Sequence, residues 1–151
     1  MSQKIADMID GLDLFRDFAY RELEVVAGYL AYQEVARGDT IFREGDPGSN
    51  MLILLEGKMG IYKGGESGQY LLSYEGRGRM VGDMALLDRE LRSASCIAET
   101  DCQLLALGGD ALDRMAVEAP AVAYHFMHNL ARLLSKRLRR TSGILAEHLL
   151  N

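Results

Sequence analysis

Short hydrophobic runs separated by glycines fill the middle of the chain. Seven runs of four to seven residues have the composition of strands: YQEVA (32–36), TIFR (40–43), MLILLEG (51–57), MGIYK (59–63), YLLSY (70–74), SASCIAE (93–99) and CQLLAL (102–107). Glycines between them suit turns that need a positive φ or a tight reversal. Short strands at this spacing predict a mainly β fold. It is either a closed or nearly closed antiparallel barrel, here called a β-roll and similar to a jelly-roll, or a sandwich.

Helical spacing of apolar residues precedes and follows these strands. Two stripes, in 4–11 and 20–31, predict small amphipathic helices before the roll. After residue 108 the strands stop. Asp110 is expected to cap a helix that runs through Val117, and Pro120 to begin a longer one.

The last predicted helix runs from residue 121 to 150 and carries a near-heptad seam. Its members alternate at steps of three and four: Met127, Leu130, Leu134, Leu138, Thr141, Leu145 and His148. A helix of roughly thirty residues is about 45 Å long and would extend beyond a domain of this size. We therefore predict that this helix pairs with a second copy of itself in a homodimer.

Composition limits the organisation and the location of the protein. The chain has 151 residues, of which 48% are hydrophobic, enough for one core. We expect one domain built from an N-terminal helical segment (1–31), the roll (32–108) and C-terminal helices (109–151). A net charge of −5 argues against general nucleic-acid binding. The sequence has no signal peptide and no run of eighteen apolar residues, which predicts a cytoplasmic protein without a membrane span.

The segment GDMALLDRELRSAS (82–95) has the composition of a phosphate site. It predicts a one-turn helix whose unpaired N–H groups and positive dipole end meet at one point. Arg92 can return to that point and donate a forked pair of hydrogen bonds. Asp83 lies too close to it for a phosphate ligand, and its oxygens suit a hydroxyl or an N–H. Such a site suits a phosphate and a sugar together.

The order of these motifs resembles the cyclic-nucleotide-binding domain family. The resemblance rests on GDTIFREGDPGSNMLILLEGKMGIY (38–62), the 82–95 segment and PAVAYHFMHNLARLLSKRLRRT (120–141), and it covers nearly the whole chain. The family includes bacterial regulators similar to the catabolite activator, regulatory subunits of cyclic-nucleotide-dependent kinases and domains of nucleotide-gated channels. The resemblance implies a binding protein with cyclic AMP, or cyclic GMP, as its regulatory ligand.

The resemblance also implies a role for individual residues. In the family a glycine and a glutamate precede the short helix, the glutamate binds the ribose 2′-hydroxyl, and an arginine binds the cyclic phosphate. Gly82 and Arg92 match this pattern, whereas Asp83 replaces the glutamate and is one methylene shorter. The remaining implied ligand contacts are the backbone N–H groups of Met84 and Ala85, Ser93 at the phosphate, and the pair Thr141 and Ser142 at the base.

Simpler roles remain open for several of these residues. Arg92 could pair with Asp88 or Glu90 across the loop. Asp83 could be an N-cap of the short helix. The basic cluster of the last helix is first interpreted as its solvated face, with DNA contact as the minor alternative: Arg132, Lys136, Arg137, Arg139 and Arg140. Four apolar residues could contact a purine or belong to the core: Val35, Ile61, Leu71 and Leu86.

Enzymatic chemistry finds no support in the sequence. His125, His128 and His148 all lie on the last helix without a third metal ligand, so we expect no metal. Cys96 and Cys102 lie in strand-like runs and are expected to be buried, inert thiols.

Two hypotheses of function follow. The first is a sensor that binds cyclic AMP and signals through its last helix to a protein effector. The second is a degenerate interaction module that kept the roll and lost the ligand, with a pocket that is empty or filled by side chains. The sequence ends at Asn151, soon after the last helix, so we expect no DNA-binding domain and no direct DNA contact in this chain.

Overall fold

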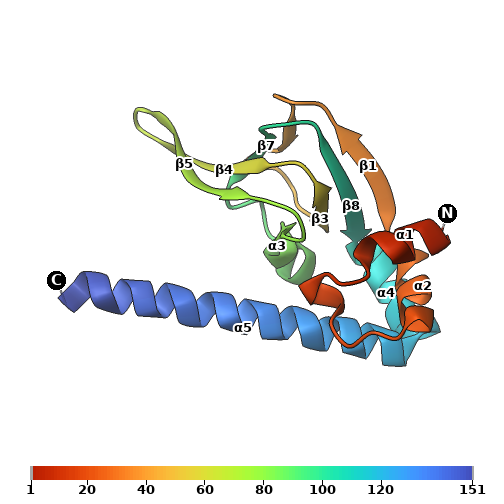
Figure 1. Ribbon diagram of the computed structural model, residues 1–151. Helices are drawn as coiled ribbons and strands as arrows, with labels where there is room; N and C mark the ends of the chain where they lie inside the picture. Colours follow the sequence, from red (N-terminus) through yellow and green to blue (C-terminus); the bar gives the residue numbers. More distant parts are fainter. Residues whose placement is uncertain (1, 151) are drawn as a thin grey trace.

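Two four-stranded sheets form the body of the protein. Over residues 2–150, which the computed structural model describes, eight strands pair, and every neighbouring pair is antiparallel (Figure 1). The first sheet has the order β1 (Ala31–Val35), β8 (Cys102–Gly108), β3 (Asn50–Glu56), β6 (Met80–Val81). The second has the order β2 (Thr40–Phe42), β7 (Ser95–Ala98), β4 (Met59–Gly65), β5 (Gly68–Glu75). The predicted antiparallel β-roll is confirmed.

The surroundings of β3 explain why its residues are hydrophobic at consecutive positions and do not alternate with polar ones. Met51, Ile53 and Leu55 belong to the core cluster that the first sheet shares with the helices. Leu52 and Leu54, which point the other way, belong to the cluster between the two sheets. A strand that is covered on both faces needs apolar residues at consecutive positions. The first sheet is therefore the middle layer of the molecule.

Helices cover the outer face of the first sheet. They are α1 (Ser2–Ile9), α2 (Tyr20–Ala27), α4 (Gly109–Glu118) and α5 (Pro120–Leu150), with the 3₁₀ turn η1 (Asp13–Phe15) after α1. The predicted helices are confirmed, but η1 was not predicted. Asp110 as the cap of α4 is wrong: Gly108 is the N-cap residue, without a side-chain hydrogen bond, and Asp110 lies in the first turn.

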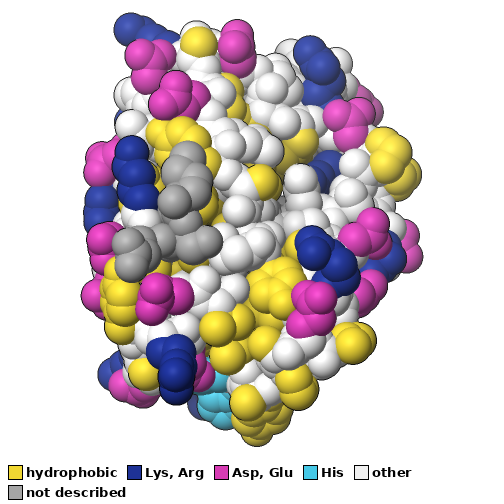
Figure 2. Space-filling model, turned by 90° about the vertical axis from the view of Figure 1, so that its right-hand side faces the viewer, with side chains coloured by type: hydrophobic (Ala, Val, Ile, Leu, Met, Phe, Trp, Pro, Cys, Tyr) yellow, Lys and Arg dark blue, Asp and Glu magenta, His cyan; other side chains and the backbone are white. Residues whose placement is uncertain are grey.

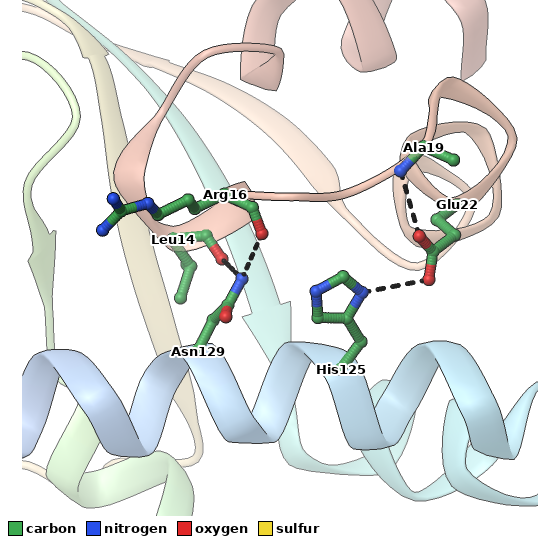
Figure 3. A network of polar contacts seen from close by, with 6 residues as sticks. All are labelled: Leu14, Arg16, Ala19, Glu22, His125 and Asn129. Atoms are coloured by element: carbon green, nitrogen blue, oxygen red, sulfur yellow. Dashed lines mark hydrogen bonds and ion pairs between the residues drawn. The ribbon is translucent and has the colours of Figure 1, made fainter.

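Polar side chains of α5 hold the N-terminal segment (Figure 3). Asn129, which is 5% exposed, donates from Nδ2 to the carbonyl oxygens of Leu14 at 3.0 Å and Arg16 at 2.9 Å. One turn earlier, Nδ1 of His125 lies 3.1 Å from Oε2 of Glu22 on α2. Two carbonyl groups and one carboxylate of the N-terminal segment are thus paired with one face of α5.

Arg132 and apolar packing complete this contact. Nη2 of Arg132 donates to the carbonyl oxygen of Asp13 at 3.1 Å and lies 3.2 Å from Oδ1 of the same residue. Phe126 and Leu130 are fully buried beside these polar groups. Residues 125, 129 and 132 are four and three apart, so they share one face of the helix. The first half of α5 is therefore bound to its own chain.

The second half of α5 has no such cover. Every residue from Ser135 to Leu149 is classed as exposed. In Figure 1 this half runs beneath the β4–β5 hairpin and continues beyond it. Its apolar members include Leu138, Ile144, Leu145 and Leu149, which are 57 to 77% exposed. The predicted overhang of the last helix is thus present.

The opposite end of the molecule carries apolar surface too. Figure 2 looks onto the end where α1, α2, α4 and the start of α5 meet, and hydrophobic side chains gather in the lower half of this face. Exposed hydrophobic residues of α4 and α5 include Val117 and Tyr124. Between residues 2 and 150, none of the helices combines the length and the apolar content that crossing a lipid bilayer requires.

Candidate functional site

Arg92 lies between the short helix α3 (Asp83–Asp88) and β7, and its side chain is held inside the roll. It is 7% exposed. Nη1 donates to the carbonyl oxygen of Asn50 at 2.9 Å, and Nη2 donates to Oδ1 of the same residue at 2.6 Å. The guanidinium also lies over the ring of Phe42, 4.3 Å from its centre. Nε is buried and has no hydrogen-bond acceptor among the described residues. The arginine is thus fixed in place, while its Nε–H lacks an acceptor in the described part of the chain.

Two glycines make room for this guanidinium. A Cβ at Gly82 would collide with Nη1 of Arg92, and one at Gly48 would lie 2.6 Å from Cβ of Ala85 and 3.0 Å from Nε of Arg92. Gly82 also has a φ of 74°, which other residues rarely adopt. The buried position of Arg92 therefore depends on the backbone of two separate turns.

A cavity of about 370 Å³ opens beside Arg92, and we call it the main cavity. Its walls come from α3, the loop after it, strands β4 and β5, and α5. Six of the predicted ligand-binding residues line it: Gly82, Asp83, Met84, Ala85, Arg92 and Ser93. Met84 and Ala85 lie in the first turn of α3, where N–H groups have no acceptor within a helix. The main cavity is open and is not filled by side chains of the described residues, and this leaves the degenerate module with an empty pocket as the alternative.

Asp83 is paired with the last helix. The residue is 3% exposed, and its Oδ1 and Oδ2 atoms lie 3.4 and 3.1 Å from Nη1 of Arg137. The N-cap role considered for Asp83 is wrong, because Gly82 is the N-cap residue and Asp83 is the first helical residue. The ion pair connects α3 to the point where the exposed half of α5 begins.

A smaller cavity of about 160 Å³ adjoins the first, and we call it the side cavity. It shares Glu75, Met80 and Arg137 with the main cavity. Thr141 lines the side cavity, and its hydroxyl donates to the carbonyl oxygen of Arg137 at 2.9 Å. Ser142 lines neither cavity. Of the two predicted base contacts, the structure brings one to the site.

The surface ion pair considered for Arg92 is not formed. Arg92 bonds neither Asp88 nor Glu90, although both acidic residues line the main cavity. Ile61 also lines the main cavity, so one of the four candidate purine contacts is placed there. The other three are not among its lining residues: Val35, Leu71 and Leu86. Leu86 is buried in the core shared by the first sheet and the helices.

The electrostatics of Arg92 favour an anion. Burial lowers the pKa of the Arg92 guanidinium from its usual value, because the charged form loses its contact with water. No carboxylate forms an ion pair with Arg92 among the described residues. A negatively charged group in the main cavity would compensate this buried charge.

Histidines and cysteines do not contribute to the site. His125 is engaged with Glu22, and the ring of His128 stacks on Tyr124. Within the described residues no three histidine, cysteine or acidic side chains are grouped so that they could hold a metal. Cys96 and Cys102 are free and buried, and burial raises the pKa of the Cys96 thiol to about 12.

Sequence reasoning missed several residues of the site, among them Arg137 and Glu75. Arg137 was assigned to the solvated face of the helix, although it contacts Asp83 and lines both cavities. Its spacing of four from Thr141 places both residues on one helical face, which is the signal that could have identified it. Glu75 was not singled out, because a carboxylate at the end of a strand resembles any solvated residue.

Comparison with known proteins gives a consistent result. A family model described as the cyclic nucleotide-binding domain matches residues 32–118. The cyclic AMP receptor protein of Thermus thermophilus is 35% identical over 130 residues, which are 85% of this chain and 58% of that protein. A CRP-like cAMP-activated global transcriptional regulator of Mycobacterium tuberculosis is 32% identical over 112 residues, 74% of this chain and 48% of the regulator. The chain thus spans about half the length of these relatives.

Solved structures share the architecture. The crystal structure of a cyclic nucleotide-binding domain from Methylobacillus flagellatus superposes with a TM-score of 0.84 at 28% identity, covering 97% of this chain and 83% of the other. The catabolite activator protein of Thermus thermophilus superposes with a TM-score of 0.79 at 32% identity, covering 89% of this chain and 62% of the other.

Proposed function

The chain belongs to the cyclic nucleotide-binding domain family, and from this premise we propose that it is a sensor which binds cyclic AMP in the main cavity. The observation that carries the proposal is the state of Arg92. Its side chain is almost fully buried, its Nε has no acceptor among the described residues, and the residue lines an open cavity. A cyclic phosphate would bring both the missing acceptor and the opposite charge.

Asp83 is the proposed acceptor for the ribose 2′-hydroxyl. Its carboxylate lines the same cavity as Arg92, and Arg137 holds it from the side of α5. A carboxylate that is already ion-paired keeps lone pairs for one further donor. Asp83 is shorter than the glutamate of the family pattern, and the ion pair with Arg137 fixes the position of its oxygens. We therefore assign Arg137 a positioning role.

Cyclic AMP is the proposed ligand because of the relatives and the side cavity. The two relatives compared above carry cyclic AMP in their names. Thr141 lines the side cavity and supports a base contact, while Ser142 stays a prediction from the sequence. The absence of a catalytic role is also a prediction from the sequence. The same holds for the cytoplasmic location.

Helix α5 is the proposed route from the ligand to a protein effector. The Arg137–Asp83 pair is the contact that joins α3 to the exposed half of α5. A nucleotide that engages Asp83 and Thr141 together would favour one arrangement of this half over others. Such a ligand shifts the population of helix positions by its differential affinity for them.

The exposed half of α5 is also the proposed homodimer interface. Leu138 and Leu145 are seven residues apart and exposed, as a heptad seam requires. Light scattering at tens of micromolar should give twice the monomer mass. A Leu138→Glu variant should give the monomer mass, and a monomeric wild-type protein would overturn this part of the proposal.

Calorimetric titration with cyclic AMP tests the ligand. We expect a dissociation constant of about 10 μM or tighter for the wild-type protein. Arg92→Lys keeps the charge but loses the fork, and Arg92→Ala loses both, so affinity should fall in that order, by about a hundredfold or more for alanine.

Arg89→Ala is the matched control for this titration. Arg89 follows α3 directly, is exposed and pairs with Asp113 of α4 at 2.9 Å, outside the main cavity. Its replacement should leave the affinity unchanged. Thermal melting of each variant shows whether it is folded. Absence of binding to the wild-type protein up to millimolar nucleotide, or equal losses for Arg89→Ala and Arg92→Ala, would overturn the proposal.

A further inference from the structure

Glu75 is a carboxylate at the boundary of the two cavities. It lies at the end of β5 and lines both the main and the side cavity. Ser73 donates its hydroxyl to Oε1 at 3.2 Å, and Nε of Arg79 lies 3.2 Å from Oε2. The side chain of Glu75 is 21% exposed. Its two neighbours therefore hold the carboxylate in a fixed, largely covered position.

A carboxylate beside a pocket for an anion is unexpected, because both groups are negatively charged. It repels the phosphate, and it attracts a ligand only through an N–H or O–H donor. In the proposed complex the 2′-hydroxyl is engaged by Asp83, so the remaining donors of the ligand belong to its base. Ser73 and Arg79 occupy two of about four acceptor positions of the Glu75 carboxylate, which leaves capacity for such a donor.

The acceptors of the side cavity agree with an amine. The Thr141 hydroxyl gives its hydrogen to the carbonyl oxygen of Arg137, so towards the cavity it is an acceptor. Glu75, at the end of β5, is a second acceptor that lines the side cavity. The exocyclic amine of adenine has two N–H groups, one for each acceptor, whereas guanine places a carbonyl oxygen at the same position of the ring.

We propose that Glu75 is the residue that selects the base, accepting a hydrogen bond from the exocyclic amine of adenine and rejecting the carbonyl oxygen of guanine. This inference rests on the proposed function, because it requires a cyclic nucleotide with its phosphate at Arg92. It assigns the preference for cyclic AMP to a single carboxylate held by Ser73 and Arg79.

Arg140 is the competing group in the side cavity. It lines this cavity from α5 and is exposed. A guanidinium that faces the purine N7 binds adenine and guanine alike, because both carry that acceptor. Arg140→Met should therefore weaken both nucleotides to a similar extent. A loss of the preference for cyclic AMP in Arg140→Met would identify Arg140 as the selecting residue and overturn the role of Glu75.

Competition between cyclic AMP, cyclic GMP and cyclic IMP provides the test. Cyclic IMP carries the carbonyl oxygen of guanine but lacks its amine at position 2, so it isolates the group that Glu75 is proposed to contact. The wild-type protein should prefer cyclic AMP over both by about tenfold or more, since the carbonyl would face an acceptor. Glu75→Gln can donate to the carbonyl and should reduce both ratios to about threefold or less.

Glu90→Gln is the matched control, because Glu90 lines the same main cavity and the variant removes the same charge. Its ratios should equal those of the wild-type protein. Ratios unchanged by Glu75→Gln would overturn the role of Glu75 alone. A wild-type preference for cyclic GMP would overturn both the role of Glu75 and cyclic AMP as the proposed ligand. Absence of binding by all three nucleotides would overturn the proposed function together with this inference.

Discussion

The two halves of α5 have the same secondary structure and opposite surroundings. From residue 120 to 134 the helix buries Phe126 and Leu130 and binds the N-terminal segment through His125, Asn129 and Arg132. From 135 to 149 every residue is exposed, and an ion pair between Arg137 and Asp83 connects this half to α3. One continuous helix is thus part of the core at one end and a free element at the other.

This difference assigns the stability of the fold to the first half of α5 and the response to ligand to the second half. A helix end with one face packed into the core contributes to folding and resists displacement. A helix end that is held by one ion pair beside the ligand cavity can change position at small cost. We therefore expect substitutions in the first half to lower the free energy of unfolding, and substitutions in the second half to alter association and ligand response.

The largest expected effect comes from Phe126→Ala. The side chain is fully buried, and its removal should lower the free energy of unfolding by about 3–5 kcal/mol. Leu145→Ala, in the exposed half, should change it by less than about 0.5 kcal/mol in the monomer. Urea denaturation at low protein concentration measures both values. Equal losses would contradict the division of the helix into two parts.

Asn129→Ala should have the next largest effect. The substitution leaves the carbonyl oxygens of Leu14 and Arg16 without their partner, at a cost of about 1–3 kcal/mol. Ser142→Ala serves as the control, since Ser142 is exposed in the other half. A variant as stable as the wild-type protein in urea would show that packing alone holds the N-terminal segment.

Arg137→Met tests the ion pair that connects the exposed half to α3. The substitution leaves the buried Asp83 carboxylate unpaired, and because Arg137 itself is half-exposed we expect a loss of about 1–2 kcal/mol. A second substitution, Asp83→Asn, should restore much of the stability by removing the buried charge. Arg139→Met should have no effect. Absence of rescue in the double variant would mean that the two residues act independently.

The smallest expected effect concerns pH. The backbone N–H of Ala19 and the side chain of His125 hold the pKa of Glu22 below its usual value. A lowered pKa in the folded state contributes stability that is present above about pH 4.3, the unfolded value, and is lost as pH falls through the folded value.

Glu22→Gln removes this contribution. Between pH 6 and pH 3 the wild-type protein should therefore lose a few tenths of a kcal/mol more stability than the variant, as expected for a partly exposed ion pair. Thermal melting across this range gives the comparison. Parallel curves for the two proteins would show that the contact between Glu22 and His125 does not stabilise the fold.

The sequence allowed the roll and the arginine of the site to be predicted, because their signals are local. Glycines mark the turns within a few residues of each strand, and Arg92 follows Gly82 by ten residues. The partner of Asp83 could not be found in this way, since Arg137 is 54 residues further along the chain. A charged side chain on a helix has the same pattern whether it faces water or a buried carboxylate.

The N-terminal contact shows the same limit. Polar residues at 125, 129 and 132 share one helical face, yet nothing in their spacing identifies the carbonyl groups of residues 13, 14 and 16 as their partners. The turn η1 contains three residues, too few for a periodic pattern. Contacts of this kind depend on the tertiary fold, which propensity and periodicity do not encode.

The uncovered half of α5 should exchange its amide hydrogens with deuterium quickly. Peptide groups between Leu138 and Leu149 have only the helix itself to protect them, and Gly143 weakens the helix at its middle. In dilute protein we expect their amide hydrogens to be replaced by deuterium well before those around Phe126. Docking of an effector or pairing of two chains would cover this half. Either event should slow amide exchange along the same dozen residues, and the slowing can be measured without a label on the partner.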